Sequence, residues 1–339
     1  MRHHQGLCHA RFREAVMIRR LPLPLGPMLL MLVLSSSVLR AQPTPGATTG
    51  TPQEAAPTPV ADWFLNHVSI RQSLKDRNTI NKPASAYLTL PREGDATKEV
   101  NGAVSIALTP PNPEFSAGLG IQFNENTALD SRQNALKVGL DSNWLRSFGP
   151  VERPTFFSDL TVLAGYKGNG EKHADGISAD VYWTFSAPAA RCPWCPQLDI
   201  GGWLNYLPMI GVEHERVIHA TGSAIEGSVT RSLLELTVNV FPLRPAVGKR
   251  LTLTADMAYR YDVQSLLGGD RRHPFGAFSA SYGLDPHNIF LIGVDYVRGE
   301  NPDEGFEGQR FARLSLKVQF DKPQKASILA ARAARASRP

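Results

Sequence analysis

Strict alternation of apolar and polar residues is the strongest indication of fold in this sequence. In residues 176–186 the alternate apolar positions are Ile177, Ala179, Val181, Trp183 and Phe185. The same period of two recurs in residues 228–241, 250–262 and 310–320. Successive side chains of a β-strand point to opposite faces, so these segments predict strands with one apolar and one polar environment.

The alternation extends over most of the chain. About twelve candidate strands occupy residues 84–91, 102–109, 115–123, 133–145, 155–166, 176–186, 198–212, 228–241, 250–262, 275–284, 289–298 and 310–320. The first connection and every second one after it are rich in charge, as in residues 213–227, while the others are mostly shorter and hold many of the prolines. The pattern predicts an all-β fold, a closed antiparallel up-and-down barrel of about 12 strands with two different rims and both ends at the same rim.

The environment of the apolar face needs separate evidence, because a soluble sandwich or a lipocalin-like barrel would also alternate. Charged residues stand at mid-strand on the polar face, which suits a wet lumen. Aromatic residues stand near the two ends of the apolar faces: Phe123, Tyr166, Tyr261 and Tyr296 near one end, and Trp144, Phe156, Phe185 and Phe320 near the other. Two aromatic belts are typical of a transmembrane barrel, whose strands need no long apolar run.

The last predicted strand carries the most specific motif. Alternate positions hold Leu314, Leu316, Val318 and Phe320. With the alternation across residues 84–320, this ending resembles bacterial outer-membrane β-barrels (porin-like, without a specific family), and the four residues resemble the C-terminal signal of that class. The resemblance implies outer-membrane lipid and the barrel-assembly machinery as partners and a Gram-negative outer membrane as location. In that class the Phe usually ends the chain, whereas a basic tail, residues 321–339, follows here.

The N-terminal region predicts export. Residues 1–41 contain a signal peptide with Arg19 and Arg20 before an apolar run, and translation is expected to start at Met17. Residues 42–60 are rich in Pro and Thr and predict a disordered linker. Residues 61–83 predict a periplasmic segment. Its helically spaced residues are Trp63, His67, Ile70 and Leu74, and a linker helix, an extra strand and a barrel plug all remain open.

Charge excludes one class of partner. The net charge of +5 comes from residues 1–41 (+5) and 321–339 (+4), which leaves −4 for the chain between them. Because that middle has no basic stripe, we expect no nucleic-acid binding.

Three further motifs could carry chemistry. Cys192 and Cys195 form a Cys-Pro-Trp-Cys turn, for which a disulfide is expected in an oxidising periplasm. A redox site would need a helix N-terminus, and a zinc site two further ligands. His214 and His219 lie near two glutamates, yet neither spacing matches a metal site, so no metal and no cofactor are expected. Without a His–Ser pair at strand spacing, a phosphate loop or a nucleophile elbow, the chain is not expected to be an enzyme, and a lipid-modifying enzyme is the second alternative.

The lumen is the predicted functional site. The strand phases direct these charged residues inward: Lys137, Asp141, Asp159, Asp180, Asp199, Glu235, Asp256, Arg260, Asp262, Asp295, Arg313 and Lys317. Acids outnumber bases in this set, so the leading hypothesis is a channel for small solutes with an acidic lumen. The alternative is a structural or binding barrel whose closed lumen is filled by ion pairs. The solute and the oligomeric state are not predicted.

Overall fold

The fold comes from a computed structural model of the chain. It describes residues 63, 67–77, 84–89, 97–109, 114–126, 133–150, 156–170, 174–186, 203–221, 226–266, 270–285, 288–300 and 308–318. All of these residues belong to one compact unit, Pro57–Pro339. The segments 1–41, 42–60 and 321–339, for which a signal peptide, a linker and a tail were expected, lie outside the described residues.

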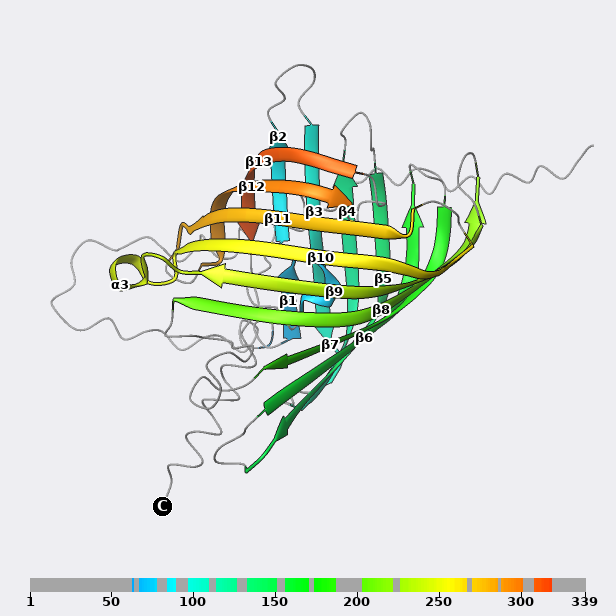
Figure 1. Ribbon diagram of the computed structural model, residues 1–339, viewed down its shortest axis with the longest axis horizontal. Coiled ribbons are helices and arrows are strands. Elements are labelled where there is room, and N and C mark those ends of the chain that lie inside the picture. Colours follow the sequence, from blue (N-terminus) through cyan, green and yellow to red (C-terminus); the bar gives the residue numbers. More distant parts are fainter. Residues whose placement is uncertain are drawn as a thin grey trace, which may run out of the picture. The chain divides into compact units, whose positions relative to one another are not determined.

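The described residues form one antiparallel sheet that curls into a barrel (Figure 1). The strands are β1 Val68–Arg71, β2 Ala84–Thr89, β3 Thr97–Ala107, β4 Phe115–Asn126, β5 Gln133–Phe148, β6 Phe156–Asn169, β7 Ala174–Ser186, β8 Leu204–Ala220, β9 Gly227–Val240, β10 Leu251–Ser265, β11 Arg272–Gly283, β12 Phe290–Glu300 and β13 Gly308–Val318. From β2 to β13 each strand pairs with the next, as in an up-and-down barrel. The predicted all-β barrel of about twelve antiparallel strands is therefore confirmed.

One seam of the barrel is only partly sealed. The last strand β13 pairs with β2 over five positions, from Leu314 opposite Leu88 to Val318 opposite Ala84. Within the described residues, the first half of β13 has a strand partner only on its β12 side. Closure thus depends on a short ladder, whereas neighbouring strands such as β5 and β6 pair over almost their whole length.

The connections β2–β3, β4–β5, β6–β7, β8–β9, β10–β11 and β12–β13 lie at one rim, called the charged rim because charge-rich connections were expected there. The strands extend further toward this rim than the sequence predicts. The connections at this rim run from four residues (170–173) to seven (301–307), and those at the opposite rim from six (284–289) to seventeen (187–203). The expectation that the charged connections are the longer ones is therefore wrong. The physical reason is that charged residues such as Lys167 and Glu215 continue the strand alternation beyond the predicted strand ends and pair inside the lumen.

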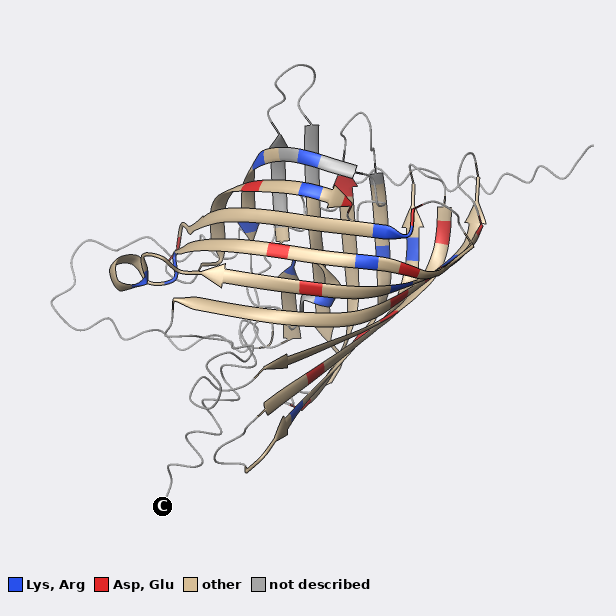
Figure 2. Ribbon diagram, viewed as in Figure 1, with Lys and Arg blue, Asp and Glu red and all other residues tan. Residues whose placement is uncertain are grey.

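The two faces of the wall have opposite chemistry. On β9, Leu234 is 58% exposed on the outer face while its neighbour Glu235 is 3% exposed on the inner face. Large exposed hydrophobic residues occur on β3–β13, and most buried charged residues lie on the same strands. Figure 2 shows positions of Lys, Arg, Asp and Glu along these strands. This is the inverse of a water-soluble protein, in which apolar side chains are buried and charges are exposed.

Helices are few and short among the described residues. Those with described bounds are α3 (Arg244–Val247), in the β9–β10 connection, and the 3₁₀ turn η1 (Leu74–Arg77). No helix in the described part of the chain is long and apolar enough to span a membrane.

The segment before β2 is not a single helix. Trp63 and His67 are helical, with the His67 Nδ1 2.8 Å from the Trp63 carbonyl oxygen, but Ile70 belongs to β1 and Leu74 opens η1. A helix carrying all four residues on one face is therefore wrong. The edge of β3 offers backbone partners to Val68–Arg71, and this tertiary pairing outweighs a weak helical spacing.

Candidate functional site

The lumen contains the predicted charged residues wherever the structure describes them. On the inner face lie Lys137, Asp141, Asp159, Asp180, Glu235, Asp256, Arg260, Asp262, Asp295, Arg313 and Lys317, all buried or half-buried. Asp199 lies outside the described residues. Alternation in each strand is what directs these side chains inward, since every second residue shares a face.

Further lumen charges were not predicted from the sequence. They are Arg71, Lys75, Lys167, Glu213, Glu215 and Arg231. Lys167 lies an even number of residues after Asp159 on β6, and Arg231 an even number before Glu235 on β9, so each faces the lumen like its partner in the alternation. Extending the alternation along both strands would identify these two residues from the sequence. The sequence pattern predicts Glu213 and Glu215 in a connection, but β8 continues to Ala220.

Charge in the described lumen is nearly balanced. The carboxylates are Asp141, Asp159, Asp180, Glu213, Glu215, Glu235, Asp256, Asp262 and Asp295. The Lys and Arg side chains are Arg71, Lys75, Lys137, Lys167, Arg231, Arg260, Arg313 and Lys317. With nine acids against eight bases, apart from His273 and Glu300 at the rim, the expected surplus of acid was overestimated because the additional residues are mostly basic.

A chain of charged contacts follows the inner wall near the charged rim. It runs from β6 to β12 through Lys167, Glu215, Arg231, Asp262, His273 and Glu300. Arg231 connects the middle, with Nη1 3.4 Å from Glu215 and Nε 3.2 Å from Asp262. The His273 Nδ1 lies 2.5 Å from Glu300. Because β6 and each of β8–β12 supply one member, the chain of contacts connects much of the barrel wall.

A second set of contacts lies deeper in the lumen. Lys137 on β5 reaches Asp180 on β7, with 2.7 Å between Nζ and Oδ2. Glu213 accepts hydrogen bonds from the Tyr182 hydroxyl at 3.2 Å and from the Arg260 Nε at 3.1 Å. Each buried charge here has an opposite charge beside it, which offsets the cost of removing it from bulk water.

The wall formed by β9–β13 has its own contacts. Lys317, 7% exposed, donates to Asp295 at 2.6 Å, to Ser281 at 2.9 Å and to Ser279 at 2.5 Å. Thr237 donates to Asp256 at 2.6 Å. On β5, the Asn143 amide hydrogen-bonds Asp159 of β6.

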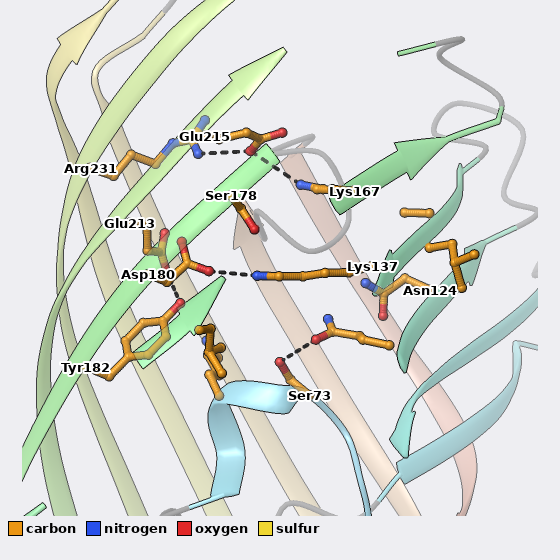
Figure 3. Close-up of a pocket in the computed structure, with 15 residues that line it drawn as sticks. Ser73, Asn124, Lys137, Lys167, Ser178, Asp180, Tyr182, Glu213, Glu215 and Arg231 are labelled. Carbon is orange, nitrogen blue, oxygen red and sulfur yellow. Dashed lines mark hydrogen bonds and ion pairs between the residues drawn. The ribbon is translucent and has the colours of Figure 1, made fainter. Parts of the chain in front are cut away.

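A polar chamber occupies part of the lumen. Its volume is about 50 Å³, room for about three to five waters. Lys137 and Lys167 project from one side of it toward Asp180 and Glu215 on the other, and Ser73 lies at the end of the turn that carries η1 (Figure 3). The arrangement can hold water or small polar solutes among paired charges.

A cluster of buried apolar residues, called the apolar ring below, interrupts this polar interior. It consists of Leu74 from η1 and of inward-facing residues from six strands: Ala103, Leu163, Tyr182, Met209, Leu233 and Ala258. Leu74 is 2% exposed and lies against the bare backbone of Gly120 on β4, where a Cβ would overlap its Cδ2. No sequence pattern predicts this ring, because its members are single apolar residues on mostly polar faces.

The other residues singled out in the sequence are the two cysteines, the apolar residues of the last strand and the loop histidines. Cys192, Cys195 and Phe320 lie outside the described residues, so the disulfide stays a prediction. On β13, Leu314 and Leu316 are exposed on the outer face and Val318 is buried. His214 lies on β8 with Nδ1 2.9 Å from the Thr230 hydroxyl, and no metal-binding group of His, Cys, Asp and Glu occurs in the described part of the chain.

Known proteins offer little similarity to this chain. No family model and no curated protein match it. One solved chain, described as "Unveiling the Mechanism Behind the in-meso Crystallization of Membrane Proteins", is similar at 12% identity over 76% of this chain and 95% of that chain. Its TM-score is 0.35, and at that level of likeness it carries no argument about this protein.

Proposed function

We propose that this protein is an outer-membrane β-barrel that conducts small hydrophilic solutes through its lumen. The observation that carries the proposal is the inverted wall, with large hydrophobic residues exposed outside and charged residues buried inside. Such a wall is stable only where hydrocarbon surrounds the barrel and water or ion pairs fill it.

Aromatic residues on the outer face support a membrane position. Near the rim opposite the charged one, Phe148 packs against Phe156 at 5.7 Å between ring centroids, and Phe156 against Phe185 at 6.1 Å. Trp183 follows at 5.5 Å from Phe185. Aromatic residues are enriched at the level of the lipid headgroups. Because β2–β13 are an even number of antiparallel strands, β2 begins and β13 ends at this rim. In our proposal this rim faces the periplasm.

Fractionation of cells that express the full chain tests the location. We expect the protein in the outer membrane, with a folded form that migrates faster on gels than the boiled form. Recovery in the soluble periplasm would remove the basis of the proposal.

A second candidate is a barrel with a closed, structural lumen. It is favoured by the pairing of lumen charges and by the position of Leu74 in the apolar ring. Recording in planar bilayers separates the two candidates, since a closed barrel inserts without producing ionic current.

A further inference from the structure

The first strand of the barrel wall is broken. β1 pairs with Ala103–Ile106 of β3, and β2 pairs with Thr97–Asn101 of the same strand. The two short strands therefore follow each other along one edge of β3. Residues 72–83 lie between them in the sequence, and the described part of this insertion, Gln72–Arg77, leaves the wall and carries η1 into the lumen.

The inserted turn makes polar contacts with two strands of the wall, β4 and β9. Gln122 Oε1 accepts hydrogen bonds from the Ser73 hydroxyl at 3.0 Å and from the Leu74 backbone N–H at 3.1 Å. On β9, Glu235 pairs with Lys75 at 3.2 Å. The two hydrogen bonds to Gln122 contribute about 1 kcal/mol each, because water replaces them when they break.

Leu74 extends from the inserted turn into the apolar ring. It fills the space that Gly120 leaves on β4 and belongs to the same buried cluster as Leu163 and Leu233. Water and ions avoid an apolar constriction, so a single leucine in such a ring is a barrier to both.

We propose that Gln72–Arg77 is a gate of the solute pathway, which opens when Leu74 leaves the apolar ring. The inference rests on the proposed channel function. The broken strand makes the movement feasible, since the turn can shift while β1 and β2 keep their ladders with β3. The polar chamber beside the turn accepts the displaced Ser73 and Lys75, whose side chains line it already.

Single-channel recording of the full chain in planar bilayers tests the gate. Leu74→Ala removes the stopper, and Gly120→Ala displaces it by placing a methyl group where Leu74 Cδ2 lies. Both should raise the open probability at least about tenfold, because burial of the leucine favours the closed state. Gly276→Ala is the matched control, since a Cβ there meets nothing closer than 4.0 Å, and should leave the open probability unchanged.

Three outcomes decide the proposal. Openings that increase in both variants, with normal heat-modifiable migration, support it. Wild type and variants that conduct alike overturn the gate and leave the channel standing. Folded barrels that produce no current in any variant overturn the channel, and the gate with it. If Gly120→Ala does not fold, the comparison of Leu74→Ala with wild type decides between the same outcomes.

Discussion

At the level of single residues, buried charges of the lumen depend on their partners. Lys317 is enclosed by Asp295, Ser279 and Ser281. Lys317→Met should reduce the free energy of unfolding by about 3–5 kcal/mol, because Asp295 loses the ammonium group that donates to it while staying buried. Denaturant titration of the barrel in lipid vesicles measures the change.

The control for this prediction is Lys167→Met. Lys167 is 25% exposed, and its partner Glu215 keeps Arg231 at 3.4 Å, so the loss should stay below about 1 kcal/mol. Equal losses for the two lysines would show that burial does not set the strength of these pairs.

The Lys137–Asp180 pair makes a prediction about ion selectivity. In a Leu74→Ala background, Asp180→Asn leaves the Lys137 ammonium uncompensated and should shift the reversal potential across a salt gradient toward anions. Lys137→Gln should shift it toward cations. Both shifts should shrink as salt rises from about 0.01 to 1 M, where the Debye length falls from about 30 Å to about 3 Å. Shifts of the same sign would contradict this assignment of the pair to the pathway.

At the level of strands, the depth of an outer-face residue should set the cost of a charge. Leu234 stands at the middle of β9, and Leu266 directly follows β10 at the charged rim. Leu234→Lys should cost about 2–4 kcal/mol of folding free energy in lipid vesicles, and Leu266→Lys about 0–1 kcal/mol. A soluble barrel would tolerate both equally, because both side chains would face water.

The strands also show which features of the fold can be predicted from the sequence. Alternation of apolar and polar residues is a local signal, so it located the twelve strands and the inner phase of residues such as Asp141 and Arg313. The predicted end of β8 is too early, because charged residues such as Glu213 and Glu215 are typical of loops. Their pairing with Arg260 and Lys167 in the lumen is visible only in the structure. β1 spans four residues, too few for a period to be detected, and its pairing with β3 is non-local.

For the barrel as a whole, the decisive question is what surrounds the wall. In the interior, ion pairs connect charged residues of different strands, and an apolar ring lies among them. On the exterior, large hydrophobic residues are exposed, as our proposal of a lipid-facing wall requires. Both environments can be probed in one strand, because β9 alternates between them.

Site-directed spin labelling along β9 is the most direct test. Cysteines placed singly at 233–238 carry the label, and the protein is measured in lipid vesicles with oxygen, which concentrates in hydrocarbon, and with a water-soluble nickel complex. A lipid-facing wall predicts that labels at the outward positions Leu234, Leu236 and Val238 are relaxed by oxygen and shielded from nickel, with the opposite preference at the inward positions Glu235 and Thr237. Outward labels that respond to nickel as strongly as exposed loop labels would contradict a lipid-facing wall.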